Sequence, residues 1–152
     1  MRWRLAATVA LCLACGGGRD GAADRLQGNW LFTDSANGFG FGIAFKPGDS
    51  YTVYTMNLTS QTSARAQIEN GTFSASDAEI TTVPKESTCA GPATVDTVKY
   101  VLSPSALVIT AGATVISLIR DTTPVDASFV LSLGCFQPDG TFVPSGLQPV
   151  SN

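Results

Sequence analysis

The sequence contains no histidine and few charged residues. Without histidine, Ser-His-Asp and Cys-His catalytic arrangements are excluded, and so is every zinc site with a histidine ligand. Aspartate, glutamate, lysine and arginine make up 14% of the 152 residues, and the formal net charge is -3. Because no basic stripe is available for phosphate contacts, we expect no nucleic acid as a partner.

Motifs for nucleotides and metals are also missing. The sequence has no Gly-x-x-x-x-Gly-Lys phosphate loop, no dinucleotide fingerprint and no calcium loop. A carboxylate pair for hydrolysis remains formally possible, but acidic residues such as Asp34, Asp49, Asp77 and Asp139 lie singly in predicted turns and strand ends. We therefore predict no catalytic residue, no cofactor and no metal.

Two arginines precede an apolar stretch at the N-terminus. Arg2 and Arg4 form a positively charged region, and in residues 5–14 only Thr8 interrupts the apolar side chains. As a helix this stretch would be about 15 Å long, which is half the thickness of a hydrocarbon core. We therefore predict that residues 1–14 are a signal peptide and not a transmembrane anchor.

The end of this stretch distinguishes two kinds of signal. Ala14 precedes Cys15, and three glycines follow. This arrangement resembles the lipobox of bacterial lipoproteins, although Cys12 and Leu13 stand where that pattern prefers a leucine and a small residue. The resemblance implies that Cys15 carries acyl chains such as palmitate and anchors the protein to the bacterial cell envelope. The absence of an acidic residue directly after Cys15 favours the outer membrane. The alternative is a soluble secreted protein.

Cys89 and Cys135 are the cysteines left after removal of the signal and lipidation of Cys15. Because proteins outside the cytoplasm are commonly oxidised, we predict one disulfide between them. The alternative is two separate buried thiols.

The chain after residues 15–25, a predicted flexible tether, favours strands. Glycine, threonine, serine and proline recur every few residues, so no long amphipathic helix is expected. We predict nine short strands at residues 29–33, 38–45, 51–58, 66–69, 72–75, 79–83, 97–102, 106–110 and 114–120.

Two details of these strands are specific. Asn70-Gly71 is a strong signal for a two-residue hairpin between the fourth and fifth runs. On residues 51–58, alternation places Thr52, Tyr54, Met56 and Leu58 on the predicted core face.

A sheet of this many strands, without helices to cover it, must close on itself or stack as two layers. We predict an all-β fold, a small up-and-down antiparallel barrel over residues 26–121; the alternative is a β-sandwich. Residues 122–152 are predicted to add one strand, at 127–133, and an extended tail. Cys135 would pin this tail to the loop at residues 84–94, against the barrel exterior or mouth.

Gly28-Asn29-Trp30 resembles the Gly-x-Trp opening of lipocalin-like barrels, and Arg120 ends the last predicted barrel strand. In that family an arginine in this place packs across the tryptophan and closes the barrel floor. The resemblance implies structural roles for Trp30 and Arg120.

Two function classes follow. The first is a non-catalytic interaction or structural domain of the cell envelope, held at the membrane by its lipid and binding another envelope protein. The alternative is binding or carriage of a small apolar ligand inside the barrel. Aromatic residues expected to line such a site are Phe39, Phe41, Phe45, Tyr54 and Phe73.

Overall fold

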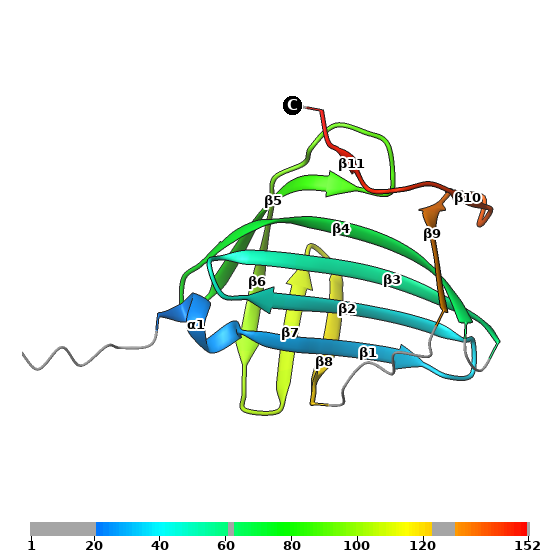
Figure 1. Ribbon diagram of the computed structural model, residues 1–152. Helices are drawn as coiled ribbons and strands as arrows, with labels where there is room; N and C mark the ends of the chain where they lie inside the picture. Colours follow the sequence, from blue (N-terminus) through cyan, green and yellow to red (C-terminus); the bar gives the residue numbers. More distant parts are fainter. Residues whose placement is uncertain (1–20, 61–62, 123–129, 152) are drawn as a thin grey trace, which may run out of the picture.

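The computed structural model describes residues 21–60, 63–122 and 130–151, which form one short helix and eleven strands (Figure 1). The helix is α1 (Ala22–Leu26). The strands are β1 (Gly28–Asp34), β2 (Phe39–Lys46), β3 (Ser50–Ser60), β4 (Ser63–Ala75), β5 (Glu79–Ser87), β6 (Asp96–Leu102), β7 (Ala106–Ala111), β8 (Thr114–Asp121), β9 (Val130–Phe136), β10 (Phe142–Pro144) and β11 (Gln148–Pro149).

Eight strands form a closed antiparallel barrel. Each of β1 to β7 pairs with the next strand in the chain, and β1 closes the ring by pairing with β8. Closure leaves no bare edge in the ring, which is how a sheet without covering helices avoids aggregation. The predicted all-β, up-and-down barrel is confirmed, and the β-sandwich alternative is excluded.

Three strands lie outside the ring. β4 has 13 residues against nine in β5, so its first residues extend beyond the barrel partner. β9 pairs in parallel with this free part of β4, at Ser63–Ala66, and β10 pairs with β9. β11 pairs with the end of β5. The predicted tail thus contains three strands, and the first three residues of the predicted run at 127–133 lie outside the described residues.

Helix α1 takes up the end of the predicted tether. The carboxylate of Asp24 accepts a hydrogen bond from the Gly21 N–H, and Arg25 forms an ion pair with Asp77. Leu26 is fully buried. One helical turn is stable here because tertiary packing holds its apolar side. Residues 22–25 of the predicted tether are therefore part of this helix.

The predicted turn at Asn70-Gly71 is wrong. β4 runs through both residues, and a bulge shifts its pairing with β5 between them. A Cβ on Gly71 would collide with the main-chain oxygen of Val83 and lie 2.7 Å from the Tyr51 ring. This glycine therefore permits a close backbone approach within a strand. The two strands predicted at residues 66–69 and 72–75 are therefore one strand, so the nine predicted barrel strands become eight.

The predicted core face of β3 is also wrong. Tyr51 is 1% exposed and Val53 packs against the core, whereas Leu58 is 48% exposed. The ring of Tyr54 lies on the outer face, over Gly42 of the neighbouring β2. Because both faces of β3 carry large side chains, period-2 alternation separated the faces without showing which one is buried.

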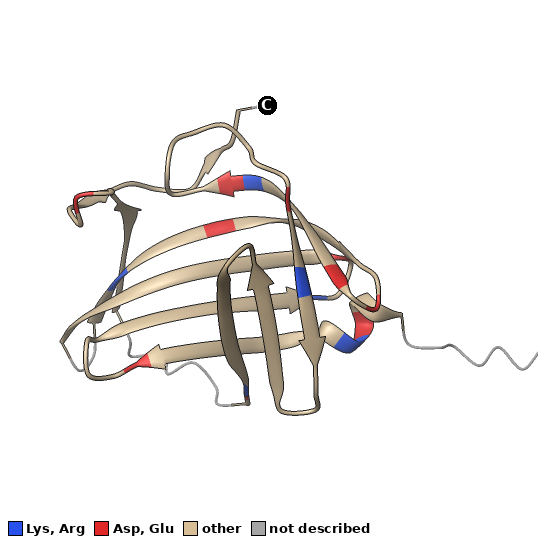
Figure 2. Ribbon diagram, turned by 180° about the vertical axis from the view of Figure 1, so that it is seen from behind, with Lys and Arg blue, Asp and Glu red and all other residues tan. Residues whose placement is uncertain are grey.

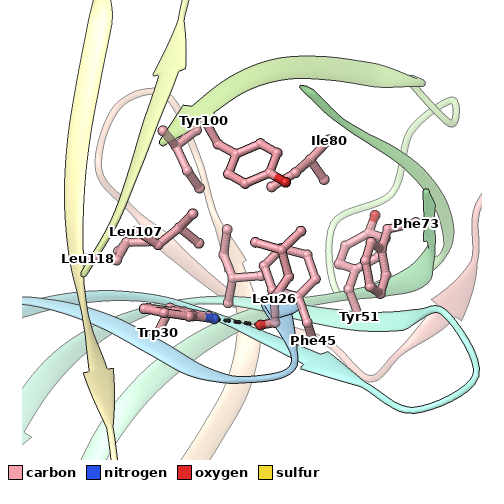
Figure 3. Close-up of a cluster of buried hydrophobic side chains, with 11 residues drawn as sticks. Leu26, Trp30, Phe45, Tyr51, Phe73, Ile80, Tyr100, Leu107 and Leu118 are labelled. Atoms are coloured by element: carbon pink, nitrogen blue, oxygen red, sulfur yellow. Dashed lines mark hydrogen bonds between the residues drawn. The ribbon is translucent and has the colours of Figure 1, made fainter. Parts of the chain in front are cut away.

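A packed core fills the end of the barrel beside α1, which we call the closed end. Trp30 is fully buried, and its Nε1 donates a hydrogen bond to the Leu26 carbonyl at 2.8 Å. The ring centroids of Phe45 and Phe73 are 4.7 Å apart. Figure 3 shows nine labelled side chains that point toward one another here: Leu26, Trp30, Phe45, Tyr51, Phe73, Ile80, Tyr100, Leu107 and Leu118.

The opposite end, which we call the mouth, is bounded by the connections at residues 35–38, 88–95 and 112–113. β3 and β4 have 11 and 13 residues, but β6 and β7 have only seven and six. Seen from behind in Figure 2, the short strands cross the long ones near their middle, and β9 stands at the far end. The inner face of the long strands is therefore less covered at the mouth.

Candidate functional site

The two predicted disulfide cysteines are bonded to each other. Cys89 follows β5 and Cys135 lies in β9, and their Cα atoms are 4.8 Å apart. Near the bond, the main-chain N–H of Phe136 donates to Gln67 Oε1 at 3.2 Å. The disulfide therefore joins the end of β5 to β9 at the mouth, where the two strands meet along β4. Cys15, the predicted lipidation site, lies outside the described residues.

Trp30 and Arg120 also come together. They are directly opposite each other in β1 and β8, and the guanidinium carbon lies 4.2 Å from the tryptophan ring centroid. The Arg120 side chain donates to the carbonyls of Gln27 and Pro104, at 2.9 and 3.2 Å. Gly28 has a φ of 129°, and a Cβ there would lie 2.8 Å from the arginine. These contacts close the barrel floor and give both residues a structural role.

The scattered acidic residues lie at turns and strand ends. Hydrogen bonds from Asn37 lower the pKa of Asp34, and those from Thr141 lower the pKa of Asp139. Asp77 is paired with Arg25. No three histidine, cysteine, aspartate or glutamate side chains in the described ranges gather as metal ligands would.

The five aromatic residues expected to line a ligand site divide into three groups. Phe45 and Phe73 are buried in the core of the closed end. Tyr54 lies on the outer face and contributes nothing to the interior. Phe39 and Phe41 line a pocket at the mouth. Only these last two stand where a ligand can reach them.

This apolar pocket lies where β1 and β8 separate. The two strands pair only over Asn29–Leu31 of β1, so Phe32 has no partner on β8 although it faces the same side as Trp30. Phe32 and Phe39 are each 39% exposed. The pocket has a volume of about 250 Å³. Its lining residues are Phe32, Phe39, Phe41, Val115, Ile116 and Ser117.

A polar pocket of about 260 Å³ lies at the same end of the barrel, across the interior. Gln67 and Glu69 of β4 and Asp96 of β6 contribute its polar groups. The segment after Cys89 and Val150 of the tail complete it. The disulfide therefore holds one wall of this pocket.

Tyr51 links the core to this polar pocket. Its ring is buried, and its hydroxyl donates a hydrogen bond to Glu69 Oε1 at 2.7 Å. Burial, followed by the hydrogen bond and the charge of Glu69, raises the pKa of Tyr51 above its ordinary value of 10.0. The tyrosine therefore stays protonated at neutral pH and keeps the carboxylate of Glu69 in place as an acceptor.

Sequence reasoning missed Phe32, Gln67, Glu69 and Asp96 as site residues. The signal for Gln67 and Glu69 is the alternation of long polar side chains with Ala64, Ala66 and Ile68. On a half-buried strand that pattern normally points the polar side chains to solvent. Here Gln67 and Glu69 face the barrel interior near the mouth, while Ala64 and Ala66 lie on the other face of the strand and are buried.

No protein family, no curated protein and no solved structure matches this chain. In the part of the chain that the structure describes, no helix has the length and apolar character needed to cross a membrane. The barrel and the two pockets described above are therefore the features that bear on function.

Proposed function

We propose that this barrel is a non-catalytic binding domain that takes up a small apolar ligand at its mouth. The observation that carries this proposal is the exposure of Phe32 and Phe39 on the inner face of the barrel, beside Phe41 and Ile116. Large apolar side chains left open to solvent in a concave site are typical of ligand-binding positions.

The divergence of the strands explains how these side chains stay open. At the closed end, Trp30 and Leu118 of β1 and β8 are fully buried. Two residues further along β1, Phe32 is partly exposed because β8 no longer lies beside it. A ligand that enters here would cover apolar surface that the protein itself leaves uncovered, which favours binding by about 25 cal/mol per Å².

Titration calorimetry with decanol tests the proposal. We expect saturable binding with a negative heat-capacity change, the mark of apolar burial. Phe32→Ala should weaken it about ten-fold. Val101→Ala is the matched control, because Val101 is 70% exposed on the outer face. Absence of saturable binding to the wild-type protein would refute the proposal.

An interaction domain of the envelope is the second candidate, favoured by an apolar patch on the outer face. Val101 pairs with Val108, and Leu31 pairs with Ile119. Val101 and Ile119 are 70% and 63% exposed. Replacing both by lysine should abolish capture of an envelope protein partner and leave decanol binding unchanged.

Attachment to the bacterial envelope, at the outer membrane, through a lipid on Cys15 is part of the proposal. Acyl chains stabilise membrane association by about 0.8 kcal/mol per buried CH₂, so a multiply acylated cysteine anchors firmly. Cys15→Ser should move the protein from the membrane fraction to the soluble fraction of the cell. Continued membrane association of this variant would exclude the anchor.

A further inference from the structure

The geometry points to an amphiphile with a neutral or cationic head group as the ligand, lying across the mouth with its apolar part in the apolar pocket and its head group in the polar pocket. This inference rests on the proposed function and names the ligand class. It depends on the register that joins the two pockets, on their volumes and on the charges around the polar one.

One row of inward-facing side chains connects the pockets. Phe32 pairs with Phe41, Phe41 with Thr55, and Thr55 with Gln67. Residues directly opposite in neighbouring strands share a face of the sheet, so all four face the barrel interior with Trp30 and Ile43. The row begins in the apolar pocket and ends in the polar pocket. It crosses three strand spacings, about 14 Å.

The volumes favour a ligand that uses both pockets. The apolar pocket measures about 250 Å³ and the polar pocket about 260 Å³. Each is smaller than the roughly 300–1,000 Å³ of sites for drug-sized ligands. A chain that lies along the row fills one pocket with its tail and reaches the other with its head group.

Charge determines which head group fits. Glu69 and Asp96 line the polar pocket, and neither has an ion-pair partner among the described residues. The nearest cation along β4 is Arg65, whose guanidinium carbon lies 5.4 Å from the Phe142 ring centroid, on the neighbouring row. An anionic head group would meet two carboxylates, whereas a hydroxyl can hydrogen-bond to them and a cation is attracted.

The test compares three ligands with the same ten-carbon chain: decyltrimethylammonium, decanol and decanoate. Titration calorimetry at neutral pH should show decyltrimethylammonium binding about ten-fold more tightly than decanoate, with decanol between them. Glu69→Gln keeps an acceptor for Tyr51 and leaves Asp96 in place, so it should reduce the preference for the cation about three-fold, with decanol affinity unchanged. Glu79→Gln, at the opposite end of β5, removes the same charge and should leave all three affinities unchanged.

The outcomes separate this inference from the proposed function. Equal affinities for all three ligands, or tightest binding of decanoate, would overturn the amphiphile class and leave apolar binding intact. Equal effects of Glu69→Gln and Glu79→Gln would also overturn it, because attraction would then come from overall charge. Failure of all three ligands to bind would overturn both the amphiphile class and the proposed function of apolar ligand binding.

Discussion

The closed end and the mouth are built from the same strands but differ in what faces inward. Along β1, Trp30 is fully buried and Phe32 is 39% exposed, although both face the barrel interior. Along β2, Phe45 is 3% exposed and Phe39 is 39% exposed. Strand pairing accounts for the difference: β8 covers β1 at the closed end and leaves it at the mouth. The barrel is thus a stable base that carries an incompletely covered site.

The largest effect expected from this comparison is that of Trp30→Ala. It removes a fully buried ring and the partner of Arg120, so the free energy of unfolding should fall by about 3–5 kcal/mol. Phe32→Ala on the same strand should cost only about 1 kcal/mol, because much of its ring is already in water. Urea unfolding measures both. Equal losses would show that the mouth is packed as tightly as the closed end.

Removal of the disulfide by Cys89→Ala with Cys135→Ala should lower the free energy of unfolding by about 2–4 kcal/mol, somewhat less than Trp30→Ala. The two cysteines are 46 residues apart, a loop long enough for a substantial entropic effect on the unfolded chain. Because the bond lies at the mouth, amide exchange in β9 and β11 should accelerate more than in β1. Uniform acceleration over all strands would contradict a local role.

The bulge of β4 provides a third test. Gly71→Ala should lower the free energy of unfolding by about 1–3 kcal/mol, because the new Cβ forces the Val83 backbone and the Tyr51 ring apart. Gly146→Ala is the control, since no atom lies within 4 Å of a Cβ placed there. Equal thermal stability of Gly71→Ala and the wild type would show that the close approach is not required.

The smallest effect on stability is expected for Tyr51→Phe, because Tyr51 lies between the core and the mouth. Its pKa is raised in the folded state, so the unfolded chain loses this proton first as pH rises. Its contribution to stability is therefore complete below pH of about 10 and declines above it. Tyr54 and Tyr100 also have raised pKa values.

Tyr51→Phe should therefore flatten only part of the alkaline decline in stability. It should also cost about 0.5–1.5 kcal/mol at neutral pH through the lost hydrogen bond to Glu69. Thermal unfolding between pH 7 and pH 11 measures both effects. An unchanged alkaline slope would mean that Tyr51 is not the group that titrates.

Much of the architecture was predictable from local signals. Short strand-forming runs between turns, too many for an open sheet without helices, indicated a closed barrel. Two cysteines left for pairing indicated the disulfide, and Trp30 with Arg120 indicated the barrel floor. The prediction of a turn at Asn70-Gly71 was wrong because that dipeptide also suits a strand that another backbone approaches closely.

The sequence by itself determined most of the barrel strands and the closure of the barrel, because alternation and turn residues act over short distances along the chain. Only the tertiary structure decided the candidate site. Phe32 is exposed because β8 diverges from β1, and Glu69 and Asp96 line one pocket although β5 lies between their strands. Strand divergence and register depend on closure of the whole ring, so no local pattern contains them.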